Sequence, residues 1–322
     1  MTYSRAEKVR AALQYSITSI GIMIVLKQTL TVYAFPSALV VAFCQSVVQF
    51  VLLVVLKQLK VIHYPQPSRT NLMSVMPLPI LQAIGIGAGL AGTKALSIPM
   101  FTLLRRISVA LTLFGEIYIL QKRQHRYTMW AVGIICAGTV VAALNDFAFD
   151  VGSYAIIMAA NIATSANGII VAKMLSGPNK REKWELLWYN SIVSLVLLGY
   201  ICHSRGHFVE ALEFMRHASL TIFVCFTISC SLGFFMQFAV VSNHQINGPL
   251  STAILGCVKN VLTTYAGVLG LGGDYIFTWP NFAGVNISLL GSLMYAYAKM
   301  KQKKIVKKEI EVGKTDKFDR VP

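Results

Sequence analysis

Apolar residues run along this chain in ten long blocks, separated by short polar or proline-containing breaks. The blocks cover residues 11–33, 36–56, 74–97, 100–120, 127–145, 151–175, 184–203, 219–242, 249–269 and 279–300. A bilayer core about 30 Å thick requires roughly 20 consecutive apolar residues in a helix, and each block is close to that length. The pattern therefore predicts an all-α polytopic membrane protein with ten transmembrane helices.

The two shortest breaks contain proline. They are Ala34-Phe35-Pro36 and Ile98-Pro99. Because proline disfavours a helical conformation in the residue before it, we expect a helix boundary at each of them. The first block is not interpreted as a cleaved signal peptide, because it is too long for the apolar core of one and contains polar residues.

Composition narrows the class of protein further. The chain has 322 residues, of which 55% are hydrophobic and 13% are charged, with 29 Lys and Arg against 13 Asp and Glu. Average soluble domains carry about 25% charged residues. Disorder requires low hydrophobicity, and six cysteines are too few for a disulfide-stapled secreted domain. Too little polar sequence is present for a soluble nucleic-acid binder, so no nucleic-acid partner is expected.

The loops between the blocks differ sharply in charge. Segments on the same side as the N-terminus hold 21 Lys and Arg residues, whereas the opposite side holds only Arg205 and Arg216. Cytosolic loops of membrane proteins are enriched in Lys and Arg. The chain is therefore predicted to place both termini in the cytosol.

Apart from Glu185 and Lys299, which are one residue from a block end, six basic residues lie inside the blocks against the single acid Glu116. They are Lys27, Lys94, Arg105, Arg106, Lys173 and Lys259. Charges within a bilayer usually face a bundle interior or a water-filled cavity. The excess of cations suggests that the missing anion is a substrate. Lys94 and Lys173 are close to block ends, where long side chains reach the interface, so the deeper Arg105, Arg106 and Lys259 are the candidates for binding it.

Glu116 shares a helix face with Arg105, but about 16 Å of helix separates them. We therefore expect Glu116 to meet a different cation, across the bundle.

Weak internal similarity at an offset near 150 residues suggests two halves. The fourth block begins PMFT at residue 99 and the ninth begins PLST at residue 249. Five helices in each half would make the halves inverted in the membrane, as is common in transporters that bind substrate between them. The predicted organisation is residues 1–150 as the first repeat, 151–300 as the second and 301–322 as a basic cytosolic tail.

Polar residues form a stripe on the ninth block. Gly256, Lys259, Asn260 and Thr263 are spaced as on one helix face. Arginine forks match phosphate oxygens and lysine acts as a point charge, so this stripe and the two arginines suit a diphosphate.

On the seventh block, Tyr189 and Asn190 could stack on and hydrogen-bond to a base. An aromatic belt at the membrane interface is the alternative interpretation of this segment.

Other motifs are set aside. Residues 87–94 (GAGLAGTK) resemble a phosphate-binding P-loop, but the Lys and Thr are in the wrong order within an apolar span. Cys202, His203, His207 and His217 lack the spacing of a metal site. Because no catalytic arrangement is visible, an enzyme is not expected, and neither a cofactor nor a metal is predicted.

Three segments resemble the nucleotide-sugar transporters of the drug/metabolite transporter superfamily. Residues 94–106 (KALSIPMFTLLRR) look like the fourth-helix segment of that family, in the form of its UDP-sugar branch. This branch includes UDP-glucuronate, UDP-N-acetylglucosamine and UDP-N-acetylgalactosamine carriers and the fringe-connection type. Residues 256–260 (GCVKN) resemble the Gly-Ala-Ile-Lys-Asn segment of the branch, and 188–191 (WYNS) lie where GDP-mannose carriers have Phe-Tyr-Asn-Asn.

The resemblance implies an antiporter in the Golgi membrane, or alternatively the endoplasmic reticulum membrane, that exchanges a cytosolic nucleotide sugar for a lumenal nucleoside monophosphate. It also implies that Tyr189 and Asn190 contact the base, and that Gly256, Lys259 and Asn260 contact sugar and phosphates. Ser191 replaces the second Asn of the GDP-mannose motif, which favours uridine over guanosine. A GDP-mannose carrier and a non-transporting membrane scaffold or regulator stay open as alternatives, as does assembly into a homodimer.

Overall fold

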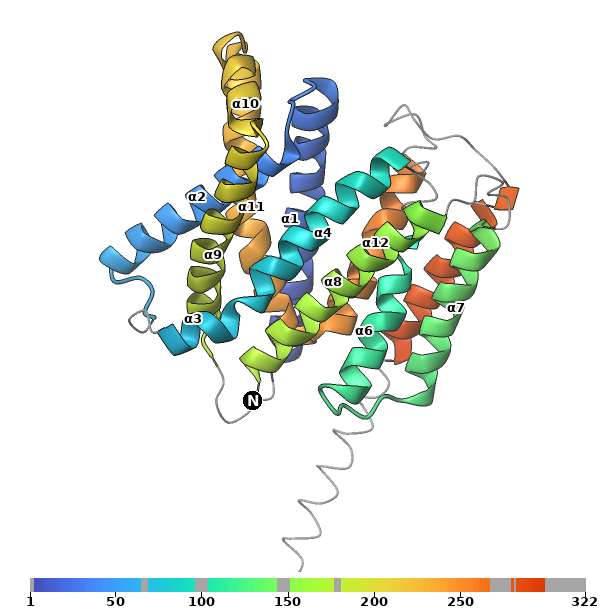
Figure 1. The fold of residues 1–322 in the computed structure, drawn as a ribbon. Coiled ribbons are helices and arrows are strands. Elements are labelled where there is room, and N and C mark those ends of the chain that lie inside the picture. Colours follow the sequence, from blue (N-terminus) through green and yellow to red (C-terminus); the bar gives the residue numbers. More distant parts are fainter. Residues whose placement is uncertain are drawn as a thin grey trace, which may run out of the picture.

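The computed structural model describes residues 3–64, 69–95, 104–143, 151–176, 181–266, 279–280 and 282–298, and within these ranges every regular element is a helix (Figure 1). In chain order these are α1 (Arg5–Lys27), the π-helical η1 (Gln28–Val32), α2 (Ala38–Gln58), α3 (Arg69–Val75), α4 (Pro77–Ala95), α6 (Ile107–Tyr118), α7 (Arg126–Ala143), α8 (Val151–Leu175), α9 (Lys183–Ser204), α10 (His207–Arg216), α11 (Leu220–Asn247), α12 (Pro249–Ala266) and a last helix, Phe282–Ala298. The predicted all-α class is confirmed.

Six stretches of the described residues are helical, long and apolar enough to cross a membrane. They are Arg5–Leu30, Ala38–Gln58, Asn71–Gly89, Val151–Leu175, Lys183–Ser204 and Leu220–Asn247. Shorter apolar helices cover Ile107–Tyr118, Arg126–Val141, Pro249–Lys259 and Phe282–Ala298. Each of these helices overlaps one of the apolar blocks of the sequence. The chain is therefore a polytopic helical membrane protein, while the number of ten crossings stays a prediction.

Local sequence explains where the first helices begin and end. Ser4 and Glu7 form a reciprocal capping box at the start of α1, with Glu7 Oε2 accepting from Ser4 N at 2.6 Å. After η1, Ala34 adopts a positive φ of 51°. The Ser37 side chain then accepts from Val40 N at the start of α2. The boundary predicted at residues 34–36 is confirmed, and the one at 98–99 lies outside the described residues.

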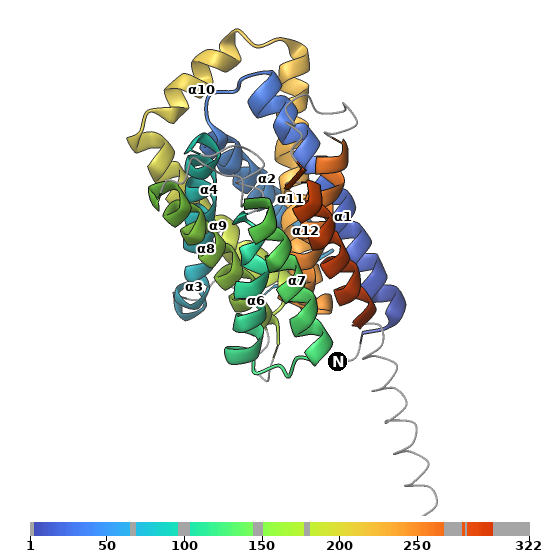
Figure 2. The same ribbon diagram turned by 90° about the vertical axis from the view of Figure 1, so that its right-hand side faces the viewer.

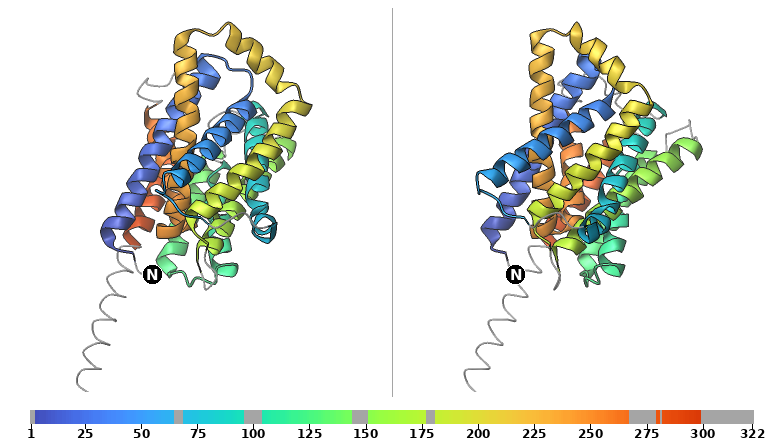
Figure 3. Two further views of the ribbon diagram at one scale, coloured as in Figure 1. Left: turned by 90° about the vertical axis from the view of Figure 1, so that its left-hand side faces the viewer. Right: turned by 60° about the vertical axis from the view of Figure 1, so that its left-hand side comes forward.

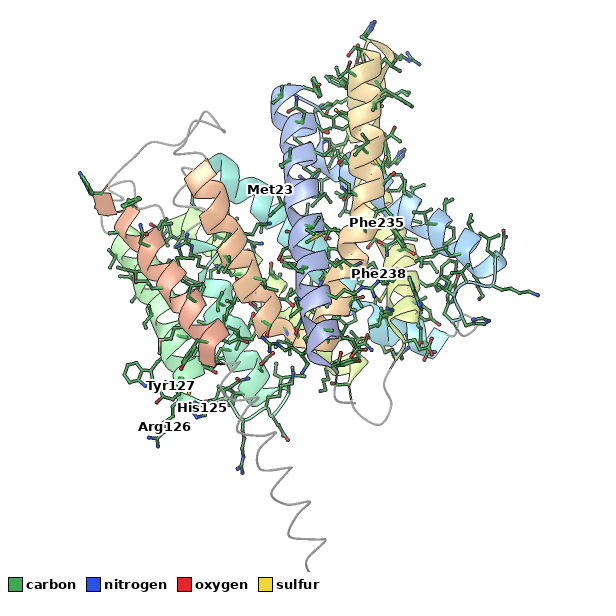
Figure 4. The ribbon with its side chains drawn as sticks, turned by 180° about the vertical axis from the view of Figure 1, so that it is seen from behind. Met23, His125, Arg126, Tyr127, Phe235 and Phe238 are labelled. Carbon is green, nitrogen blue, oxygen red and sulfur yellow. The ribbon has the colours of Figure 1, made fainter. Side chains whose placement is uncertain are left out.

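The helices pack in pairs from different parts of the chain. α4 lies along α8, α1 lies along α11, and α2 contacts both α9 and α11. α6 packs against α8 and α12. Figure 4 shows α1 beside α11, which carries the labelled Phe235 and Phe238. These pairings surround a central space with α1, α2, α4, α6, α8, α11 and α12.

Glycines bring α7 and the last helix into backbone contact (Figure 1). A Cβ atom at Gly138 would stand 2.6 Å from the carbonyl oxygen of Gly284, and one at Gly291 would stand 2.9 Å from that of Ala131. Ser288 Oγ donates to the carbonyl oxygen of Ile135 across the same contact at 3.2 Å. Small residues allow this close approach between helices in membranes.

α10 lies between two of the apolar blocks, at residues where the hydropathy pattern predicts a loop. Its apolar face packs Phe208, Ala211 and Phe214 against a cluster that includes Phe35 of the α1–α2 connection. Figures 2 and 3 show α10 joining α9 to α11 at the end of the molecule opposite to the N-terminus. The helix is only ten residues long, too short to have been detected by a span-length criterion.

Candidate functional site

A cavity of about 640 Å³ lies among helices from both halves of the chain. Its wall is formed by residues of α1, α2, α4, α6, α8, α11 and α12, and by Arg105 in the turn before α6. No Asp or Glu is present among the described residues that line it. The lining therefore carries two fixed cations, Arg105 and Lys259, without a described acidic partner.

Neutral hydroxyl groups hold both cations in place. Lys259 Nζ donates to Ser19 Oγ at 2.9 Å, and Ser19 is fully buried on α1. Arg105 Nη1 donates to Thr164 Oγ1 of α8 at 3.3 Å. Because hydrogen bonds to an ionised acceptor are stronger than those to a hydroxyl, an anion in the cavity can replace these partners favourably.

Arg106 is separated from this pair, although it is the next residue after Arg105. Its side chain is 1% exposed, does not line the cavity, and its three guanidinium nitrogens have no hydrogen-bond partner among the described residues. Consecutive side chains on a helical turn point about 100° apart, and here Arg105 faces the cavity whereas Arg106 does not. Of the two arginines predicted to bind substrate, the structure places only Arg105 at the cavity, and substrate binding by either stays a prediction.

The structure separates Tyr189 and Asn190 from the cavity surface. Tyr189 is 1% exposed and belongs to an apolar cluster with Leu186 and Leu187. Asn190 does not line the cavity, but its Nδ2 donates to Gln82 Oε1 at 3.3 Å, and Gln82 does. The neighbouring Trp188 stacks on Phe50 and on Tyr64. Both aromatic residues of this segment therefore pack against other side chains of the protein.

The stripe predicted on α12 is partly within the described residues. Gly256 and Lys259 both line the cavity, as their spacing on one helix face predicts. A Cβ atom at Gly256 would lie 3.6 Å from the hydroxyl oxygen of Tyr15, so α12 and α1 are neighbours at this point of the cavity. The side chains of Asn260 and Thr263 lie outside the described part of the structure.

Four amide side chains that the sequence analysis did not select also line the cavity. They are Gln45, Gln82, Asn167 and Gln237. Gln45 donates through Nε2 to the carbonyl oxygen of Ser229 at 3.2 Å and packs on Gly233, where a Cβ atom would stand 2.6 Å from its Cγ. A search for every polar residue inside the apolar blocks, rather than only the charged ones, would have found them.

Glu116, which does not line the cavity, bonds to the start of α12. Its Oε1 accepts from Leu250 N at 3.1 Å, and its Oε2 accepts from Gln124 Nε2 at 2.7 Å. Lys122 Nζ is 3.9 Å from Oε1. The cation that Glu116 meets therefore comes from the loop after its own helix, not from across the bundle as expected. What lies across from it is the N-terminus of α12, which favours a negative charge.

Comparison with known proteins assigns the chain to a family. A sequence model of the triose-phosphate transporter family matches residues 11–296. The chain belongs to the triose-phosphate transporter family. Within the described residues, the matched range contains the whole lining of the cavity.

Relatives in this family confirm the resemblance to the UDP-sugar branch. UDP-sugar transporter UST74c of Drosophila melanogaster is 34% identical over 309 residues, which cover 96% of this chain and 82% of the relative. UDP-sugar transporter sqv-7 of Caenorhabditis elegans is 34% identical over 303 residues, covering 94% and 91%. A crystal structure of another protein aligns with a TM-score of 0.59 at 12% identity, covering 89% of this chain and 98% of that chain, and shows a shared fold alone.

Proposed function

We propose that this triose-phosphate transporter family member carries a UDP-sugar from the cytosol into the Golgi lumen in exchange for UMP. The sequence motifs favour UDP-GlcNAc, UDP-GalNAc or UDP-glucuronate as the nucleotide sugar. The endoplasmic reticulum is the alternative compartment. The observation that carries the proposal is the cavity in which Arg105 and Lys259 meet without an acidic residue in the described lining. The names of both relatives, which are transporters and not enzymes, agree with it.

The two cations suit the two phosphates of such a substrate. Lys259 offers a compact point charge, and Arg105 offers a planar fork that can bind two phosphate oxygens. Their present partners, Ser19 and Thr164, are hydroxyl groups that can also accept or donate to phosphate and sugar oxygens. Binding would thus exchange neutral partners for charged ones within a largely apolar bundle.

The two cations come from different proposed repeats of the chain, and this supports a mechanism of alternating access. Arg105 belongs to the proposed first repeat, residues 1–150, and Lys259 belongs to the second, 151–300. If these are two inverted five-helix repeats, the substrate binds between them, and rocking one against the other opens the site to each side in turn. The phosphates would then hold the two halves together in the loaded state.

Uptake into proteoliposomes tests the phosphate site. Lys259→Ala should lower UDP-sugar uptake roughly tenfold or more, because a charge-assisted hydrogen bond is lost. Lys173→Ala is the matched control, since Lys173 is exposed on α8 and does not line the cavity. Normal uptake by Lys259→Ala would overturn the assignment.

Competition and thermal stability separate the alternatives. UMP should compete with uptake more strongly than GMP does, whereas the reverse order would favour a GDP-mannose carrier. A ligand that binds only the folded protein must raise its stability. Absence of stabilisation by every nucleotide and nucleotide sugar in a panel would therefore favour a non-transporting scaffold or regulator.

A further inference from the structure

Two amide side chains line the cavity from the paired helices α4 and α8. Gln82 and Asn167 both line the cavity. Asn167 Nδ2 donates to the carbonyl oxygen of Leu78 at 3.1 Å, and Leu78 stands one turn before Gln82 on α4. Residues four apart on a helix are neighbours on its surface, so the two amides form one polar patch.

The bond to Leu78 fixes the orientation of the Asn167 amide. A backbone carbonyl oxygen can only accept, so the nitrogen of the side chain must face it. The oxygen Oδ1 is then left for the cavity, and no described residue donates to it. Asn167 therefore presents a hydrogen-bond acceptor.

Gln82 is oriented in the opposite sense by a residue outside the cavity. Its Oε1 accepts from Asn190 Nδ2 of α9 at 3.3 Å. Because the oxygen faces Asn190, the nitrogen Nε2 is the group that Gln82 offers to a ligand, and no described residue accepts from it. The wall thus presents a donor beside an acceptor.

We propose that this pair reads the base of the nucleotide, with Asn190 as the positioning residue behind it. Uracil presents a carbonyl, O4, beside the N3–H group, which matches Gln82 Nε2 and Asn167 Oδ1. Guanine presents the same order, with O6 beside N1–H. Cytosine and adenine present an amino group beside an unprotonated ring nitrogen, so both hydrogen bonds would be lost. The pair therefore rejects cytidine and adenosine nucleotides.

The position of the patch agrees with the phosphate site on which this inference rests. Thr164, which accepts from Arg105, stands three residues before Asn167 on α8, or about 4.5 Å along the helix axis. The base-contacting amide and the partner of the phosphate cation thus lie on the same wall of the cavity. The inference deepens the proposed function, because it assigns the base specificity of the same cavity.

Equilibrium binding of UMP, CMP, GMP and AMP to the purified full chain tests the pair. The unchanged protein should prefer UMP to CMP by about tenfold or more, the discrimination expected of a two-bond base contact. Gln82→Glu replaces the donor with an acceptor-only carboxylate, so the UMP-to-CMP affinity ratio should fall about tenfold. Gln45→Glu makes the same chemical change elsewhere in the cavity, and should weaken both nucleotides while leaving their ratio unchanged.

Asn190→Asp tests the positioning role separately. The new carboxylate can only accept, so the Gln82 amide should rotate, give its nitrogen to position 190 and present its oxygen to the base. The UMP-to-CMP ratio should then fall as in Gln82→Glu, although residue 190 does not line the cavity. A merely structural role of Asn190 would weaken both nucleotides equally.

The outcomes distinguish this inference from the proposed function. An unchanged ratio in both Gln82→Glu and Asn190→Asp would overturn the base-reading pair, while binding of UMP to the unchanged protein would still support the transporter. Preference for GMP over UMP would overturn the UDP-sugar assignment and keep the pair. Failure of the unchanged protein to bind any of the four nucleotides would overturn both.

Discussion

Three charged side chains inside the apolar helices, those of Lys259, Arg105 and Glu116, have hydrogen-bond partners of different kinds. Lys259 and Arg105 donate to hydroxyl groups at a cavity, whereas Glu116 is 5% exposed and bonds to backbone and amide groups. A buried carboxylate is tolerated only when its oxygens are bonded. Both oxygens of Glu116 meet this condition, since one accepts from Leu250 N and the other from Gln124.

Glu116 is expected to hold α6 and α12 together. Glu116→Ala should lower the free energy of unfolding by about 1–3 kcal/mol, because the buried Leu250 N–H group loses its acceptor. Glu116→Gln keeps an acceptor in the same place and should cost less. The thermal unfolding midpoint of detergent-purified protein measures both effects, and equal midpoints for Ala and the unchanged residue would contradict the helix-linking role.

At the scale of helices, two kinds of contact hold elements together: close backbone approach and packing of large side chains. α7 meets the last helix through Gly138 and Gly291, where a Cβ atom would stand within 3 Å of backbone atoms. α10 instead packs through large aromatic side chains such as Phe208 and Phe214. The first contact tolerates no added carbon without a backbone shift, because backbone atoms cannot move aside as a flexible side chain can.

A pair of alanine variants on α7 tests this contact. Gly138→Ala should lower the thermal unfolding midpoint, because its Cβ would stand 2.6 Å from the Gly284 carbonyl oxygen and overpacking costs about 1–3 kcal/mol. Gly133→Ala lies on the same helix with no atom within 4 Å of its Cβ. That control should be neutral or slightly stabilising, since alanine favours helix over glycine. A neutral Gly138→Ala would show that the two helices separate readily.

For the whole molecule, a basic connection and one with equal numbers of Arg and Glu lie at opposite ends. Figure 4 shows His125, Arg126 and Tyr127 where α7 begins, next to a loop that also carries Lys122 and Arg123. The α9–α10–α11 connection lies at the other end, as Figures 2 and 3 show. Lys and Arg loops stay on the cytosolic side of membranes, which predicts the sidedness of both ends.

Epitope insertion tests this sidedness in selectively permeabilised cells. An epitope in loop 121–125 should bind antibody once the plasma membrane alone is permeabilised, because that loop is predicted to be cytosolic. An epitope between α10 and α11, at residues 217–219, should bind only after the internal membranes are opened as well. The reverse pattern, or equal access to both epitopes, would contradict the predicted orientation.

How far each feature could be predicted depends on whether it is local in sequence. The break at residues 34–36 follows from Pro36 and the capping Ser37, and the helix face that joins Gly256 to Lys259 follows from helical spacing. The different fates of Arg105 and Arg106 do not follow from local sequence. Both are cations in one turn, and which of them faces the cavity depends on how α6 is rotated against α8 and α12.

The sequence by itself determined that this is an apolar helical bundle with basic loops and buried cations, because length, hydropathy and charge act segment by segment. Tertiary structure decided that Glu116 bonds to the start of α12, that Asn190 lies behind Gln82, and that four amides share the cavity with Arg105 and Lys259. Residues that bond to one another in the structure are up to 240 positions apart in the chain, as are Ser19 and Lys259. Hydrogen-bond partners at such distances are set by the packing of whole helices, which no local pattern encodes.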